Sequence, residues 1–84
     1  MEYNKNKVDE MTLALMWLTT FSEKIAGELY FRSWKGYDWN AMDRLYEKGL
    51  IDNPVGKAKS VSLTNKGRKL SEELFKKIFV EYEK

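Results

Sequence analysis

The chain has 84 residues, a formal net charge of +2 at pH 7, 33% charged and 43% hydrophobic residues, and no cysteine or histidine. This length suits one small domain, over residues 1–84, and the composition excludes global disorder. Without cysteine or histidine, disulfides, thiolate chemistry, catalytic triads and the common zinc sites are excluded, and we expect no cofactor. The polar N-terminus and the short apolar runs predict a cytoplasmic protein with no membrane association.

The first predicted element is a helix from about Lys7 to about Lys24, with Asn4 or Asn6 as its cap and Gly27 as its stop. Its apolar residues form two stripes, which leaves little polar surface: Val8, Met11, Leu15 and Leu18 in one, Leu13, Trp17 and Phe21 in the other. A helix that is apolar almost all round must be covered on both sides. We therefore favour a subunit interface on this helix, and the alternative is a central helix wrapped by its own chain.

Residues 28–35 allow two interpretations. Leu29, Tyr30, Phe31 and Trp34 have strand propensity and suit a short first strand. The alternative is a short helix followed by a turn at 36–38, as in a helix-turn-helix. We favour the strand.

Residues 38–74 form one pattern. Asp38 is placed to cap a helix that runs to Lys48, and Gly49 ends it. The turn-forming residues 52–56 and a strand from Ser60 to Leu63 then predict a two-stranded wing. Thr64 caps the last helix, in which Gly67 allows a close approach to a neighbour.

Both terminal helices carry more apolar surface than one small core needs. We therefore predict a homodimer in which these helices intertwine. The predicted interface residues are Leu13, Trp17, Phe21, Phe75, Phe79 and Tyr82.

Two tryptophans and a tyrosine surround Gly36. Trp34, Tyr37 and Trp39 can line an aromatic pocket for a planar effector. The alternative, which we favour, is that Tyr37 and Trp39 anchor the following helix in the core while Trp34 packs under the hairpin.

Two stretches, LYEKGLI at 45–51 and VSLTNKG at 61–67, resemble the signature of winged-helix regulators of the multiple-antibiotic-resistance and phenolic-acid-repressor types. A wider set of residues, from WKGYDW at 34–39 to PVGKAKSV at 54–61, resembles a family of small bacterial and archaeal domains of unknown function. The first resemblance implies an α+β winged-helix fold in which residues 38–48 form the recognition-type helix. The second implies no activity.

The winged-helix resemblance implies a DNA-binding transcriptional regulator. Its candidate contacts come from the helix, the wing and the start of the last helix: Asn40, Arg44, Lys48, Lys57, Lys59, Lys66, Arg68 and Lys69. Residues 57–71 contain no acid, which favours phosphate contacts. On the helix, phosphate contacts are disfavoured by the negative charges of Asp38, Asp43 and Glu47. The alternative function is a protein-interaction module with the same fold that binds an unknown protein partner, and on either interpretation we expect no enzyme.

Overall fold

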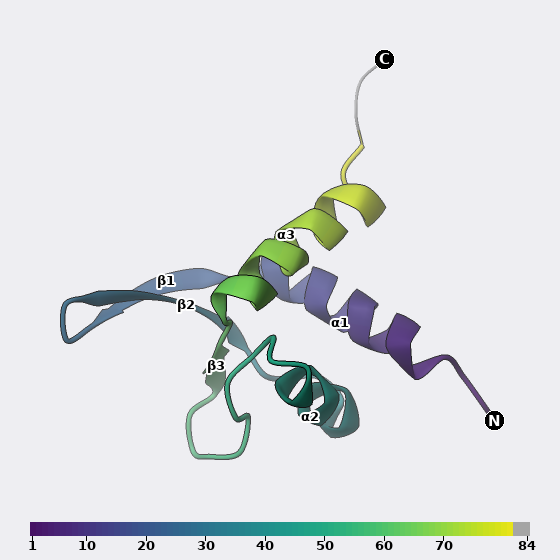
Figure 1. Ribbon diagram of the computed structural model, residues 1–84, viewed down its shortest axis with the longest axis horizontal. Coiled ribbons are helices and arrows are strands. Elements are labelled where there is room, and N and C mark those ends of the chain that lie inside the picture. The colour runs from purple at the N-terminus through teal and green to yellow at the C-terminus, as the bar shows by residue number, and fades with distance from the viewer. Residues whose placement is uncertain (82–84) are drawn as a thin grey trace.

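The computed structural model describes residues 1–81, which form three helices and a three-stranded antiparallel sheet in the order β1-β2-β3 (Figure 1). The elements are α1 (Lys5–Leu18), β1 (Phe21–Ile25), β2 (Glu28–Trp34), α2 (Trp39–Glu47), β3 (Ser60–Ser62) and α3 (Asn65–Ile78). The predicted α+β class is therefore confirmed. Predicted Tyr82 lies outside the described residues.

The first helix ends earlier than predicted. The Asn4 side chain caps it by accepting from the backbone N–H of Lys7 at 3.0 Å, as expected. However, α1 stops at Leu18, because the hydroxyls of Thr19 and Thr20 both donate to the Met16 carbonyl, at 3.4 and 2.6 Å. Side-chain bonds of this kind compete with the helical ladder and close its last turn.

The residues after this turn form a β-hairpin in place of the predicted end of the helix. Phe21–Ile25 pairs with Glu28–Trp34, with Phe21 opposite Arg32. Ala26 and Gly27 join the strands at φ of 52° and 82°, the positive angles that a tight two-residue hairpin turn requires. Gly27 is thus a turn residue and not a helix stop. The prediction of a strand in residues 28–35 is confirmed, and the short-helix alternative is wrong.

The helix α2 forms as predicted, but the wing after it is reduced. Asp38 accepts from the N–H of Ala41 at 3.0 Å, and Gly49 follows the helix with φ of +74°. The strand expected before the turn amounts to one bridge, between Ile51 and Leu63. Within residues 1–81, β3 pairs instead with β2.

The last helix packs closely on the segment after α2. Thr64 caps it by accepting from the N–H of Gly67 at 3.0 Å. A Cβ at Gly67 would overlap the backbone carbonyl of Leu50, so this approach requires glycine. The predicted role of Gly67 is confirmed.

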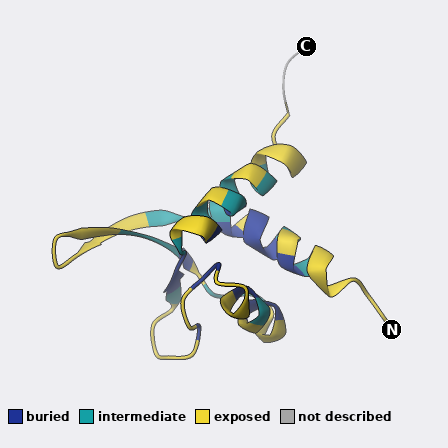
Figure 2. Ribbon diagram, in the orientation of Figure 1, coloured by how far each residue is buried: buried dark blue, intermediate teal, exposed yellow. Residues whose placement is uncertain are grey.

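The core lies where α1, α2 and the sheet meet. Its buried members are Leu13, Met16, Met42, Leu45, Leu50, Ile51, Val61 and Leu63. Figure 2 shows that the tip of the β1–β2 hairpin and the C-terminal end of α3 lie outside this core and are exposed. Within residues 1–81, none of the helices has the length and hydropathy needed to cross a bilayer.

Candidate interaction surface

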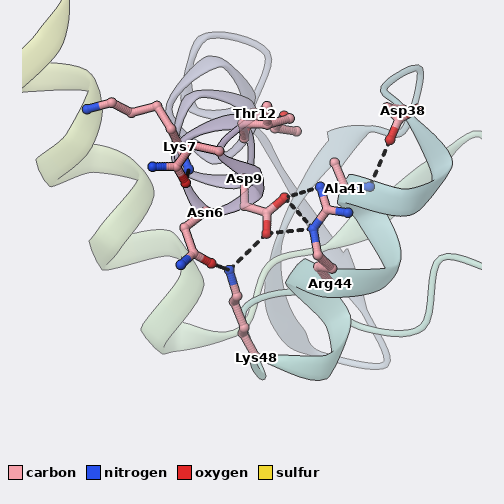
Figure 3. Close-up of polar contacts among 10 residues, drawn as sticks. Asn6, Lys7, Asp9, Thr12, Asp38, Ala41, Arg44 and Lys48 are labelled. Carbon is pink, nitrogen blue, oxygen red and sulfur yellow. Dashed lines mark hydrogen bonds and ion pairs between the residues drawn. The ribbon is translucent and has the colours of Figure 1, made fainter. Parts of the chain in front are cut away.

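One buried carboxylate organises the contact between α1 and α2. Asp9 of α1 has a side chain only 2% exposed, and it faces Arg44 of α2 and Lys48, which follows α2 as its C-cap (Figure 3). The Arg44 Nε lies 2.9 Å from both Asp9 oxygens and its Nη2 lies 2.8 Å from Oδ1. The Lys48 Nζ donates to Oδ2 at 2.8 Å. A single carboxylate therefore accepts from both basic side chains of the helix.

The titration of Asp9 follows from this arrangement. Burial alone raises the pKa of the Asp9 carboxyl, but hydrogen bonds and positive charge from Arg44 and Lys48 outweigh burial and leave its pKa below the ordinary 3.8. The hydrogen bond with Asp9 also raises the pKa of Arg44. Asp9 and Arg44 therefore both carry their charges at neutral pH.

These contacts correct the predicted orientation of two candidate DNA contacts. Arg44 and Lys48 were expected on the outward side of α2, but both point to α1, since Asp9 binds them. The side chain of Arg44 is 22% exposed and that of Lys48 is 41% exposed. A pattern in the sequence does mark Asp9, because it precedes Leu13 and Met16 by four and seven residues, in line with the core face of α1. The position of Asp9 on this face therefore distinguishes it from the exposed acids of the chain.

The outer side of α2 is aromatic and acidic. Trp39 is 60% exposed and Tyr46 is 45% exposed, and with Asp43 between them they lie one helical turn apart, at i, i+4 and i+7. Asn40 and Glu47 are also exposed on this helix. We call Trp39, Asn40, Asp43, Tyr46 and Glu47 the outer face of α2. Its charge is negative, because the two cations of the helix are bound to Asp9.

The expected anchoring of the helix by Tyr37 and Trp39 holds for one of the two side chains. Tyr37 is partly buried and packs on the core. Trp39 does not, since it is largely exposed. Trp34 contacts Phe21 of the β1–β2 hairpin with tilted rings whose centroids lie 5.1 Å apart, and it is 52% exposed. The sequence could not separate these roles, because all three residues are equally suited to a core.

The remaining candidate DNA contacts lie on the loop 52–59 and on α3. Lys57, Lys59, Lys66 and Lys69 are exposed. Arg68 is half-buried instead, and its guanidinium carbon lies 4.6 Å above the Phe31 ring. It therefore fixes α3 to β2 through a cation–π contact. A lysine that was not predicted, Lys35, holds the loop by donating to the carbonyls of Pro54 and Gly56 at 2.7 and 3.1 Å.

The candidate dimer residues divide between core and surface. Leu13 is a core residue and is 1% exposed. Trp17, Phe21 and Phe75 are half-buried, while Phe79 is 42% exposed and contacts Phe75 with ring centroids 5.4 Å apart. Only the α3 pair therefore lies at an element end that projects from the domain (Figure 1).

The acids on the described part of the chain do not form a metal-binding cluster. Within residues 1–81, there is no group of three or more aspartates and glutamates placed to hold a metal ion. Asp9 is the acid with the strongest polar contacts, and its partners are cations of the same chain.

Comparison with known proteins identifies the family of the chain. Residues 4–81 match the model of a family described as a domain of unknown function, DUF6429. The chain is 48% identical over 79 residues to the uncharacterized protein y4hR of Sinorhizobium fredii (strain NBRC 101917 / NGR234), which covers 94% of this chain and 97% of that protein. No solved structure matches the chain. Neither similarity connects it with the multiple-antibiotic-resistance or phenolic-acid regulators, whereas the expected membership of a small family of unknown function is confirmed. The chain belongs to the DUF6429 family.

Proposed function

We propose that the protein is a non-catalytic interaction domain whose outer face of α2 binds a basic segment of a partner protein. The observation that carries the proposal is the capture of Arg44 and Lys48 by Asp9. Because Arg44 and Lys48 pair with Asp9, neither of them neutralises the acidic side chains of the outer face of α2.

The composition of the face supports a protein partner. Tryptophan and tyrosine are the residue types most enriched among those that dominate binding energy at protein interfaces. Trp39 and Tyr46 are both exposed on α2, and each can accept a lysine or arginine over its ring. Asp43 and Glu47 lie beside them on the same helix. A segment rich in lysine and arginine therefore complements both the aromatic and the acidic side chains, whereas the phosphates of DNA are repelled.

The proposal is tested by titrating the protein with a short synthetic peptide rich in lysine and arginine while following tryptophan fluorescence. The double substitution Asp43→Lys with Glu47→Lys should weaken binding by about tenfold or more, since it reverses the charge of the face. The matched control, Glu23→Lys with Glu28→Lys, changes the net charge equally but lies on the β1–β2 hairpin, away from α2 (Figure 1).

Two results would reject the proposal. One is the absence of peptide binding to the unmodified protein at low salt. The other is an equal loss of affinity in the α2 variant and in its control, which would show that only net charge matters.

DNA binding by a cytoplasmic transcriptional regulator with a winged-helix arrangement is the second candidate function. One observation favours it, because Lys57, Lys59, Lys66 and Lys69 are exposed in a stretch that contains no acid. These lysines can hold phosphates, while Asn40 remains the exposed polar group of α2 that can contact a base. This arrangement favours contacts with the DNA phosphates over recognition of the base sequence.

This second candidate predicts binding to duplex DNA that falls steeply with salt, with a log–log slope of about −0.9 for each phosphate neutralised. Substituting Lys57→Glu with Lys59→Glu should weaken binding and reduce that slope. If the protein does not bind a mixed-sequence duplex at low salt and high protein concentration, DNA binding is eliminated. Titration with the basic peptide under the same conditions distinguishes the two functions, because each predicts binding to only one of the two ligands.

A further inference from the structure

A cavity lies where α1, α3 and the end of α2 meet. Its volume is about 240 Å³. Pockets for drug-sized ligands have about 300–1,000 Å³, so this one suits a smaller molecule. Most of its wall is apolar and consists of leucines from the three helices and from the segment after α2: Leu13, Leu45, Leu50, Leu70 and Leu74. Leu70 and Leu74 are only partly buried, so α3 offers an apolar surface to a branched aliphatic group.

Polar side chains of α1 and of the α2 C-cap line the rest of the cavity. The Lys48 Nζ donates to Asp9 at 2.8 Å and to the side-chain oxygen of Asn6 at 3.4 Å (Figure 3). An ammonium group has three N–H donors, so one remains for a ligand. The amide nitrogen of Asn6 donates to no group within residues 1–81. This part of the cavity therefore offers donors that suit a carboxylate.

Glu10 supplies a charge of the opposite sign. It lies one turn after Asn6 on α1, lines the same cavity and is exposed. No cation within residues 1–81 pairs with it. Asp9 differs, because it already accepts from Arg44 and Lys48. Glu10 is therefore the carboxylate that remains for a positively charged group of a ligand.

These two charges decide the class of ligand. Glu10 repels a simple carboxylic acid, and Lys48 repels a simple amine. A molecule that carries an ammonium group and a carboxylate on one carbon atom complements both. The Cβ atoms of helical residues one turn apart are separated by about 5–6 Å, so two such adjacent groups fit between Glu10 and Asn6.

We propose that this cavity binds a free aliphatic α-amino acid of about the size of leucine. The ligand carboxylate accepts from Lys48 and Asn6, and the ligand ammonium group donates to Glu10. The aliphatic side chain packs on Leu70 and Leu74. The site lies on the α1 side of α2, so it is separate from the outer face of α2 and does not depend on the function proposed there.

The first test is calorimetric titration with L-leucine and three analogues. We expect L-leucine to bind with a dissociation constant of about 1 mM or lower. Three analogues each lack one part: 3-methylbutylamine the carboxylate, 4-methylpentanoate the ammonium group, and glycine the aliphatic side chain. Each should bind at least about fivefold more weakly, since each loses an ion pair or an apolar contact.

The second test is the variant Glu10→Gln, which replaces an exposed side chain and should fold normally. It should weaken L-leucine binding by about fivefold. Binding of 4-methylpentanoate should not weaken, because Glu10 contributes nothing favourable to a ligand without an ammonium group. The control Asp43→Asn removes an exposed carboxylate on the outer face of α2 and should leave both affinities unchanged.

The third test locates the ligand. In amide NMR spectra of the unmodified protein, L-leucine should shift the signals of Glu10, Leu70 and Leu74 and leave those of the β1–β2 hairpin tip unchanged.

Four results would overturn the proposal. The first is no binding of L-leucine at ten times the expected dissociation constant, and the second is binding of the amine or of the acid as tight as that of L-leucine. The third is an equal loss of affinity for L-leucine and 4-methylpentanoate in Glu10→Gln. The last is a set of NMR shifts confined to residues away from the cavity.

Discussion

Replacing Asp9 by asparagine tests the ion cluster between α1 and α2. The substitution keeps the shape of the side chain but removes the charge that Arg44 and Lys48 share. Removing one partner of a fully buried ion pair costs about 3–5 kcal/mol. Here the cations keep 22% and 41% of their exposure and can turn toward water, so we expect a loss of about 2–3 kcal/mol in the free energy of unfolding.

This loss is large for so small a domain, whose total stability is on the order of 4–13 kcal/mol. It is measured by urea unfolding followed through tryptophan fluorescence. With a slope of about 1 kcal/mol per molar urea, the midpoint should fall by about 2–3 M. The control Asp43→Asn removes an exposed carboxylate on α2 and should change stability by less than about 0.5 kcal/mol.

A midpoint for Asp9→Asn within about 0.5 M of the unmodified protein would refute this reasoning, because the ion cluster would then contribute nothing measurable. A double-mutant cycle with Lys48→Met isolates the pairwise energy from changes in packing. We expect the two losses to be strongly non-additive, since either variant removes the same contact between Asp9 and Lys48.

The remaining predictions concern acid and two backbone positions. Folding lowers the pKa of Asp9, so its carboxylate stabilises the folded state at pH values above the unfolded pKa of 3.8. This stabilisation is lost as the pH falls through the lower pKa of the folded state. The urea midpoint of Asp9→Asn should therefore fall less steeply with pH, below about pH 4, than that of the unmodified protein. Gly67→Ala should cost about 2–3 kcal/mol by pushing the new methyl into the Leu50 carbonyl, whereas Gly36→Ala, with open space at its Cβ, should stay within about 1 kcal/mol. Ala26→Asn should raise stability by about 0.5–1 kcal/mol in the same assay, because Ala26 has φ of 52° and asparagine tolerates that conformation better; unchanged or lower stability would contradict this.

Local sequence signals gave the helix starts and the strand before α2. Asn4, Asp38 and Thr64 each accept from a backbone N–H three residues on, as their sequence positions predict. The glycine after α2 has the positive φ expected of a helix stop. These features depend on residues within one turn, so they can be read without knowing the fold.

The end of α1 was the main failure of sequence reasoning. Phe21 continues the helical spacing of Leu13 and Trp17, so the pattern predicted a longer helix. The two threonine hydroxyls and pairing with β2 decided otherwise. The pairing of β1 with β2 outweighs the helical spacing here, because that spacing extends only one turn past Trp17, to Phe21.

The sequence by itself determined the α+β class, the caps, the close approach at Gly67 and the absence of cysteine and histidine chemistry. The tertiary structure alone decided which side of α2 faces solvent. Asp9 lies 35 residues before Arg44 and 39 before Lys48, and helical spacing cannot tell whether a lysine or arginine faces water or a buried carboxylate on another helix. That contact turned the basic side of α2 inward and left the aromatic and acidic side exposed.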